Sequence, residues 1–494
     1  GERHMFLNDD NTPRFSTTLS HTLFGVPAIL LGTNIATYRI WDGIRGLDYL
    51  ESRPDIDPKR LGCTGNSGGG TLTSYIMALD DRVQVAVPNC YITSFEELLP
   101  SIGPQDAEQN IYNFVGEGFN HADFLLMRAP KPTLISAATQ DFFNIDGTWD
   151  SFRQAKRFYT RLGRPEHIDI IETDEGHGYS KAHRENMVRW MRRWFLNIDE
   201  PVTEEDFPIL TIEETHCTPQ GEVILLDGAA NIYNFFAEEA ERLKEKREVN
   251  WNKLSQEDKR NRIKDTLGLP YLPQKSPILT TPIQDYENEN YTLKHIIIIS
   301  HPAYNAYIPA MSYRSKKPNS DSILFLHDTN KEGAINGKTA EDLAKEGYNV
   351  LAVDLCGIGE TQSDNLYDSW KEAAPDWSDY FRGYLLGKSF VAMRTQDILT
   401  CLNAITDLEI TIMAKGPLCI PALHATALYR DAALKNLMLD SPIPSWHDVA
   451  TTPNNYQQLM STVHGALHYY DLPDFEALIG PEKITKINQH LPTF

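Results

Sequence analysis

A serine lies between glycines in Gly65-Asn66-Ser67-Gly68-Gly69, and it is the residue of this chain best placed for nucleophilic chemistry. The apolar run Leu61-Gly62-Cys63 precedes this G-x-S-x-G pattern, and Gly70-Thr71-Leu72 follows it. Such a turn between a strand and a helix exposes the serine hydroxyl, and its glycines are needed because no Cβ fits where the backbone doubles back. The pattern also occurs in structural loops and phosphate-binding turns, so the rest of the chain has to decide between these interpretations.

Two later residues could complete a Ser-Asp-His triad. Thr133–Ala138 predicts a buried strand, and Asp141 follows it closely. Ile168–Ile171 predicts a further strand, and the loop after it carries His177 between two glycines. Asp141 could instead cap a turn, and His177 could be a solvated loop residue. The order of these residues is that of α/β hydrolases and differs from the chymotrypsin and subtilisin orders, so it favours the catalytic triad Ser67, Asp141 and His177.

The chemistry of these groups predicts a role for each. The Ser67 hydroxyl is a poor nucleophile at neutral pH, so His177 must take its proton during attack and return it to the leaving alcohol. Asp141 would hold the imidazole in one tautomer and stabilise the cation that forms. We expect the oxyanion to bind the main-chain N–H of Gly68 and a second donor from an earlier loop, which the sequence does not identify.

The elements that would position the triad can also be traced in the sequence. Asn34–Leu50 predicts an amphipathic helix ahead of the elbow strand, and it is the first strong element of the chain. Ser180–Leu196 predicts a second amphipathic helix that closes the unit. The early strands of an ordinary hydrolase sheet are not visible before the elbow, so we expect them to be missing upstream. Residues 1–200 are therefore predicted to form a catalytic α/β-hydrolase unit with a mostly parallel sheet.

Composition limits the classes of partner. The chain has 494 residues, of which 41% are hydrophobic, so it can bury large cores and should hold two or three domains. Its net charge of -22 argues against nucleic acid or an anionic membrane surface as partners. No run of about 18 apolar residues predicts a membrane span. The six cysteines lack C-x-x-C spacing, and no H-E-x-x-H or similar motif occurs, so we expect free thiols rather than disulfides, no metal and no cofactor.

Residues 201–290 differ in composition from the segment before them. Thr211-Ile212 and Val223–Leu226 lie on either side of a turn-forming stretch and predict a strand hairpin. The stretch from Ile232 to Thr266 predicts a highly charged helix with opposite charges at helical spacing, typical of a solvated linker between domains.

Residues 291–494 predict a second α/β unit that repeats the first. The stretch from Leu30 to Asp42 matches that from Leu385 to Asp397 at a constant spacing, with Arg39 matching Arg394. The corresponding elbow lies in Ile410–Leu418, where there is no serine and Pro417 lacks the N–H that would serve an oxyanion. We expect a degenerate hydrolase-like unit without a nucleophile. It would be a stabilising lobe, a wall of the substrate cleft or a sugar-binding surface.

Four segments together resemble one family. They are Trp41-Asp42-Gly43-Ile44-Arg45, Ser52-Arg53-Pro54, Gly62–Gly70 and Gly103-Pro104-Gln105-Asp106-Ala107-Glu108-Gln109-Asn110. They resemble the bacterial acetyl xylan esterase-like α/β hydrolases, closely over residues 1–198 and in degenerate form over 295–470. The resemblance implies a secreted or periplasmic enzyme that removes acetyl groups from decorated plant polysaccharides, with Ser67, Asp141 and His177 as its triad. The implied partner is an acetylated carbohydrate.

Other functions stay open at this point. A methyl or glucuronoyl esterase acting on glycans that contain uronic acid would use the same triad. A prolyl-oligopeptidase-like peptidase shares the elbow and the triad order, although no propeller-like repeat of short strands is seen. A non-catalytic carbohydrate-binding protein would not explain the intact elbow. Gln105, Asp106 and Gln109 could contact sugar hydroxyls, or they could cap a helix beginning near Asp106.

Overall fold

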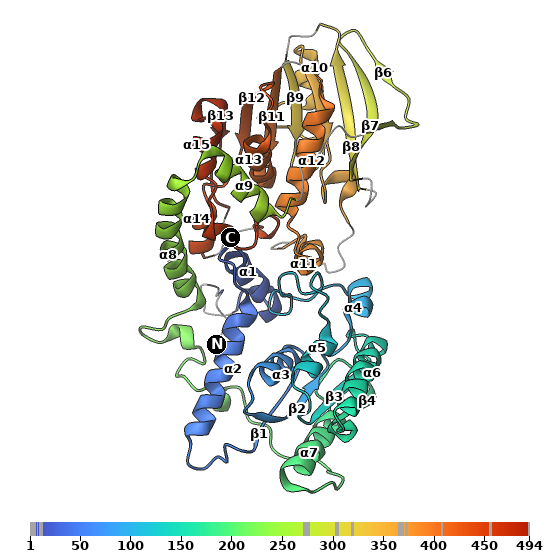
Figure 1. The fold of residues 1–494 in the computed structure, drawn as a ribbon, viewed down its shortest axis with the longest axis vertical. Helices are drawn as coiled ribbons and strands as arrows, with labels where there is room; N and C mark the ends of the chain where they lie inside the picture. The colour runs from blue at the N-terminus through green and yellow to red at the C-terminus, as the bar shows by residue number, and fades with distance from the viewer. Residues whose placement is uncertain are drawn as a thin grey trace. The chain divides into compact units, whose positions relative to one another are not determined.

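The computed structural model divides the chain into two compact units, both visible in Figure 1. Unit 1 consists of Asn34–Ala229 and Tyr384–Gly387, and unit 2 consists of Met5–Thr33, Ala230–Gly383 and Lys388–Phe494. The structure describes residues 6, 8, 13–269, 277–301, 306–317, 321–363, 370, 374–406, 409–453 and 457–492.

Unit 1 alternates strands and helices. Its elements are α2 (Ile35–Ser52), β1 (Leu61–Asn66), α3 (Gly68–Leu79), β2 (Val83–Asn89), α4 (Phe95–Ser101), α5 (His121–Met127), β3 (Thr133–Gln140), α6 (Ile145–Arg161), η2 (Pro165–His167), β4 (Ile168–Gly176), α7 (Lys181–Leu196), η3 (Glu213–Thr215) and η4 (Val223–Leu225). The four strands form one sheet in the order β1-β2-β3-β4, and every neighbouring pair is parallel. The carboxyl ends of all four strands therefore lie at one edge of the sheet, where ligands of α/β sheets commonly bind.

Helices cover both faces of this sheet. One apolar cluster joins residues of α2, α3, α5 and α6 to strand residues such as Ala86 and Ile135. A second cluster joins the neighbouring residues Val87 and Leu134 to Trp190 of α7. Because successive strand residues point to opposite faces, α7 packs on the face opposite to the other helices. The amphipathic helix predicted from Ser180 to Leu196 is confirmed, and Met187 and Trp190 of α7 lie on the face that packs on the sheet.

Two predictions for residues 201–290 are wrong. No strand hairpin forms between Thr211 and Leu226, where the described chain has only the short 3-10 helices η3 and η4. Apolar side chains of this segment, such as those of Ile209 and Ile212, are largely exposed and so are not packed into a sheet. The predicted linker helix is two helices, α8 (Ile232–Lys253) and α9 (Gln256–Leu267), and α8 buries Phe236 and Trp251 instead of being solvated.

Unit 2 contains a larger mixed sheet. Its strand order is β13-β12-β11-β9-β10-β8-β7-β5, with β6 also paired to β7. β8 is antiparallel to both neighbours, whereas the pairs from β10 to β13 are parallel. Its elements are α1 (Thr17–Leu30), α8, α9, β5 (Ile278–Thr280), β6 (Tyr286–Glu287), β7 (Tyr291–His301), β8 (Ala306–Ser315), β9 (Asp321–Leu326), α10 (Ala340–Lys345), β10 (Asn349–Val353), η6 (Gly359–Thr361), α11 (Trp377–Leu385, whose last two residues belong to unit 1), α12 (Phe390–Ala404), β11 (Glu409–Lys415), η8 (Gly416–Leu418), α13 (Cys419–Leu428), β12 (Leu434–Asp440), α14 (Trp446–Thr451), η9 (Leu459–Ser461), η10 (Ala466–His468), α15 (Asp474–Ile479), η11 (Pro481–Lys483) and β13 (Ile484–Ile487).

The two units share details of backbone geometry. The β1–β2 register shifts between Leu61 and Gly62, and the β11–β12 register shifts at the same place, between Ile410 and Thr411. The residue after β1 has a positive φ of 58°, and Gly416, the residue after β11, has a φ of 54°. Gly416 thus stands after β11 as Ser67 stands after β1; that the two turns descend from one repeated unit stays a prediction.

Each unit also holds a short segment that the sequence placed in the other. Leu385 accepts hydrogen bonds in unit 1 from the main-chain N–H groups of Val115 and Gly116, both at 3.0 Å. Ile29 accepts one in unit 2 from Gly465 at 2.8 Å. The boundaries predicted near residues 200 and 291 therefore differ from the observed units.

Helix α1 was not predicted from the sequence. It is buried on nearly all sides, and its interior holds Pro27, so no amphipathic stripe marks it. No single helix in the described part of the chain is long and apolar enough to cross a membrane, and the bent pair α1 and α2 passes that test only by length and composition.

Candidate active site

Ser67 lies at the turn between β1 and α3. Its φ of 58° and ψ of −121° place it in a backbone conformation that non-glycine residues rarely adopt. Its main-chain N–H donates to the carbonyl of Asn89 at 3.1 Å, which holds the turn against the end of β2. A Cβ at Gly65 would approach the Gly69 carbonyl oxygen to 2.5 Å, and one at Gly70 would approach the Asn89 oxygen to 2.4 Å. The turn therefore requires glycine at both positions and has the geometry of a nucleophile elbow.

The first turn of α3 presents a free donor beside this serine. Gly68 is the first residue of the helix, so its N–H has no partner within the helix. Among the described residues, no other acceptor receives it either. The positive end of the helix dipole lies at the same place, which suits a developing negative charge.

Asp141 and His177 come together at the carboxyl ends of β3 and β4. The Nδ1 atom of His177 lies 2.9 Å from both carboxylate oxygens of Asp141. The Asp141 side chain is 1% exposed and that of His177 is 23% exposed. Oδ1 of Asp141 also accepts the main-chain N–H of Phe143 at 3.0 Å. Because an ionised carboxylate can only accept, Nδ1 carries a proton, and in the neutral imidazole the lone pair is then at Nε2.

The surroundings of Asp141 favour its charged form. Burial raises the pKa of Asp141, but hydrogen bonds from His177, Phe143 and Cys90 outweigh burial, and the net shift is downward. The ring of Phe142 stacks on the imidazole of His177 with centroids 4.3 Å apart. The imidazole is thus held on one side by the carboxylate and on one face by an aromatic ring.

Asn89 connects the serine turn to the histidine loop. Its side-chain nitrogen donates to Oδ1 of Asn66 at 2.6 Å and to the main-chain oxygen of Gly178 at 3.0 Å. Asn66 precedes the serine and Gly178 follows the histidine, and Asn89 itself is completely buried. Asn89 was not predicted from the sequence as a site residue, although the polar end of the apolar strand Val83–Asn89 is the same signal that identified Asp141.

Cys90 is a second residue that was missed. Its thiol lies 3.5 Å from the Gly178 carbonyl, and its sulfur falls within 4.8 Å of the ligand atoms of Asp141 and His177. Burial raises the pKa of Cys90 to about 12, so the group is a neutral thiol at pH 7. All six cysteines are unpaired, as expected.

The predicted site residues therefore fall into two groups that Asn89 connects. Asp141 and His177 are hydrogen-bonded to each other, whereas Ser67 and Gly68 lie at the elbow. No hydrogen bond between the Ser67 hydroxyl and His177 occurs among the described residues. Catalytic hydrogen bonds are often long or poorly aligned before substrate binds, so this geometry is compatible with a triad.

The segment 103–110 has a structural role. No helix begins near Asp106, contrary to one of the interpretations above. Asp106 is buried and accepts the Glu108 N–H at 3.0 Å, while Asn110 donates to the carbonyls of Gln105 and Asp106, both at 2.7 Å. The carboxylate of Glu108 lies 3.7 Å from Nε of Arg39.

Comparison with known proteins agrees with this architecture. Residues 32–198 match the model of the prolyl oligopeptidase family. This segment is an α/β-hydrolase domain. The predicted α/β-hydrolase fold class is confirmed; the structure shows a parallel sheet in unit 1 and a mixed sheet in unit 2, and the relationship between the two units stays a prediction. A Bacillus subtilis (strain 168) protein that is described as a putative hydrolase is 25% identical over 209 residues, and the match covers 37% of this chain and 69% of that protein.

Solved structures with a related fold include carbohydrate esterases. A family 15 glucuronoyl esterase from Caldicellulosiruptor kristjansonii is 23% identical with a TM-score of 0.30, over 36% of this chain and 55% of that chain. A Bacteroides fragilis protein described as an acetyl xylan esterase is 17% identical with a TM-score of 0.40, over 53% of this chain and 71% of that chain. The chain thus spans about half the length of the first of these structures.

Proposed function

We propose that unit 1 is a serine esterase that removes acetyl groups from a decorated plant polysaccharide or oligosaccharide. The observation that carries the proposal is the buried Asp141, which holds Nδ1 of His177 in a loop that Asn89 ties to the serine turn. Nε2 of His177 is then the available base, and the Ser67 hydroxyl is the nucleophile.

The reaction would run in two steps. Ser67 Oγ attacks the ester carbonyl carbon while Nε2 of His177 accepts the hydroxyl proton. The intermediate collapses, its C–O bond to the sugar breaks, and the sugar alcohol leaves with that proton. Water then attacks the acetyl-serine, with His177 again taking the proton, and acetate leaves while the Ser67 hydroxyl is restored.

Two features would stabilise the charges that form. The oxyanion accepts the free N–H of Gly68 at the start of α3, where the helix dipole adds to the attraction. The imidazolium faces the Asp141 carboxylate, whose lowered pKa keeps it charged at neutral pH. No part of this cycle needs a metal or a cofactor.

The carbohydrate substrate is supported by the motifs in Trp41–Arg45 and Gly103–Asn110, through the family that they resemble. The same resemblance supports a secreted or periplasmic location. Methyl or glucuronoyl esters are the nearest alternative, since the triad acts on the ester carbonyl and not on the sugar.

Turnover of p-nitrophenyl acetate and of acetylated xylo-oligosaccharides by the purified chain tests the proposal. Ser67→Ala should lower kcat by at least about 10³-fold while the melting temperature and the circular dichroism spectrum stay the same. Thr71→Ser, on the same helix, is the matched control and should keep most of the activity. Full turnover by Ser67→Ala would exclude this serine as the nucleophile.

A serine peptidase is the second candidate function, because the matched family model is that of the prolyl oligopeptidases. Peptide p-nitroanilides distinguish the two. Their cleavage by the wild-type chain but not by Ser67→Ala, with acetyl esters left intact, would replace the esterase by a peptidase. Release of methanol from methyl glucuronate esters in place of acetate would change the ester class.

A further inference from the structure

Unit 2 keeps a cavity at the edge of its sheet where the active site of unit 1 would lie. The cavity has a volume of about 300 Å³, within the range of small-molecule sites. Its lining includes Asp328 and Ile358, which follow β9 and β10, and Pro417, which follows β11. The carboxyl ends of three neighbouring parallel strands therefore form one of its walls.

This cavity cannot work by the serine mechanism. Gly416 stands where unit 1 has its nucleophile, and Pro417 has no N–H to offer an oxyanion. A Cβ at Gly416 would approach Oδ2 of Asp328 to 2.7 Å, so a side chain at this position would require the Asp328 side chain to shift. The cavity could therefore bind a small molecule without cleaving it by this mechanism.

Its most unusual lining residue is Arg394, on α12. The residue is 4% exposed, and among the described residues its hydrogen bond runs from Nε to the main-chain oxygen of Cys356 at 2.9 Å. Burial lowers the pKa of Arg394, and attraction to Cys356, Asp376 and Asp397 does not offset it. A buried guanidinium in a cavity normally has a bidentate anionic partner.

Unit 1 identifies the partner that unit 2 has lost. Arg39 stands in α2 where Arg394 stands in α12, five residues after the N-cap in both helices, and its partner is the buried carboxylate of Glu108. The segment around Glu108 corresponds to the segment around Met460. Five residues after each of these, Asn113 and Gly465 both have a positive φ, and the main-chain N–H of each donates to a carbonyl near the end of a helix. Met460, at the position of Glu108, lines the cavity beside Arg394.

The remaining lining fits a sugar. Asp328 and Asp376 offer oxygen acceptors for hydroxyl groups, whereas Leu459 and Met460 offer apolar surface for the face of a ring. One cation and several acceptors suit a ligand that has a carboxylate at one end and hydroxyls around the rest.

We propose that this cavity is a non-catalytic binding site for a hexuronate, whose carboxylate pairs with Arg394 in place of the glutamate that unit 1 supplies. The site would hold a uronate residue of a glycan without cleaving it. This inference is independent of the esterase proposal, because it uses residues of unit 2 alone.

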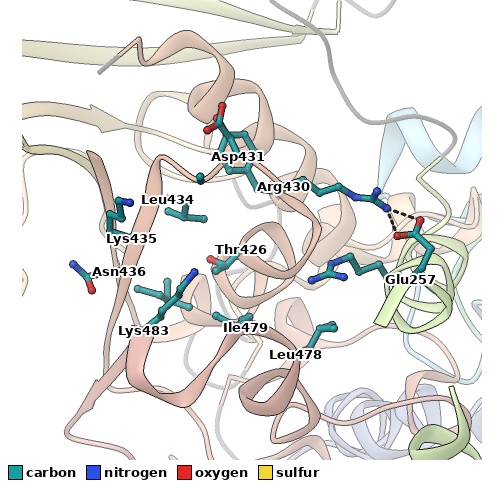
Figure 2. Close-up of a pocket in the computed structure, with 14 residues that line it drawn as sticks. Glu257, Thr426, Arg430, Asp431, Leu434, Lys435, Asn436, Leu478, Ile479 and Lys483 are labelled. Atoms are coloured by element: carbon teal, nitrogen blue, oxygen red, sulfur yellow. Dashed lines mark hydrogen bonds and ion pairs between the residues drawn. The ribbon is translucent and has the colours of Figure 1, made fainter. Parts of the chain in front are cut away.

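A second pocket of unit 2 is less suited to binding a carboxylate. Figure 2 shows this pocket, which has a volume of about 320 Å³ and lies at the amino ends of β12 and β13, near Leu434 and Lys483. Its Arg430 already pairs with Glu257, since Nη2 donates to both carboxylate oxygens, and Lys435 is exposed. It supplies a matched cation for control experiments.

Isothermal titration of the full chain tests the proposal with D-glucuronate, its methyl ester and D-glucose. We expect glucuronate to bind at least about tenfold more tightly than the two uncharged sugars, because each of these loses a charge-assisted hydrogen bond. Met460→Glu should abolish glucuronate binding by restoring an internal partner, whereas the neutral Met460→Gln should retain it.

The control is Lys435→Gln in the other pocket, which should bind glucuronate as the wild type does. Thermal melting establishes that each variant is folded, so no esterase measurement is needed. Equal affinity for glucuronate and glucose, absence of glucuronate binding by the wild type, or equal binding by the Glu and Gln variants at position 460 would overturn the proposal.

Discussion

The side-chain amide of Asn89 donates to the main-chain oxygen of Gly178 at 3.0 Å, and the main-chain carbonyl of Asn89 accepts the main-chain N–H of Ser67 at 3.1 Å. One buried residue at the end of β2 thus holds both the nucleophile turn and the loop of the histidine. The relationship is more specific than packing, because it joins the two segments whose side chains would have to meet in the proposed reaction.

Replacement of Asn89 tests this positioning role. Asn89→Ala should lower kcat on p-nitrophenyl acetate by about 10²-fold, because small displacements of reacting groups cost that much, with a smaller change in KM. Tyr179→Phe is the control. Tyr179 lies in the same loop as His177, and the substitution removes its 2.6 Å contact with Thr64 of β1 but leaves Asn89 in place. If both variants lose activity in proportion to their loss of melting temperature, Asn89 is only structural.

The lowered pKa of Asp141 predicts a pH dependence of stability. The folded form releases its proton more readily than the unfolded chain does, so this carboxylate stabilises the fold fully above its ordinary pKa of 3.8. The contribution is lost as the pH falls below 3.8 through the folded value. Urea unfolding of the wild type and Asp141→Asn between pH 7 and pH 3 should show a difference in the free energy of unfolding that shrinks in the acid range. A difference that stays constant would contradict the shift.

Two neighbouring glycines of α3 should respond to alanine in opposite ways. At Gly70 a Cβ would approach the Asn89 oxygen to 2.4 Å, so Gly70→Ala should lower the free energy of unfolding by about 1–3 kcal/mol and reduce activity. At Gly69 no atom lies within 4 Å of the added Cβ. Gly69→Ala should therefore be neutral or stabilise the helix by up to about 1 kcal/mol. Similar denaturation midpoints for the two variants would show that the elbow tolerates a side chain.

The cysteines should differ in reactivity according to exposure. Cys217 is exposed, whereas Cys90, Cys401 and Cys419 are buried and burial raises the pKa of each. A thiol reagent such as DTNB should modify Cys217 rapidly in the native chain and the three buried thiols only after unfolding. Peptide mapping identifies the modified residue, and Cys217→Ser should remove the fast phase. Fast modification of Cys90 would show that the His177 loop opens in solution.

Strongly periodic elements were predictable from the sequence. The strands at Thr133–Gln140 and Ile168–Gly176 begin with short stretches rich in apolar residues, and the helix Lys181–Leu196 has one apolar face, so local patterns suffice to find them. Helix α1 was not predicted, because it is buried on nearly all sides and has no amphipathic pattern. Residues 223–226 were wrongly predicted as a strand, because an apolar run becomes a strand only when another strand supplies its hydrogen bonds.

The sequence by itself determined the elbow, the chain order of Ser67, Asp141 and His177, and the loss of a serine at the second elbow. These depend on residue type and on neighbours along the chain. Only the tertiary structure decided that Asn89 joins the elbow to the histidine loop, and that Arg394 faces a cavity where Arg39 faces a glutamate. Such contacts connect residues far apart in sequence, and their energy comes from burial and hydrogen-bond geometry that no local pattern records.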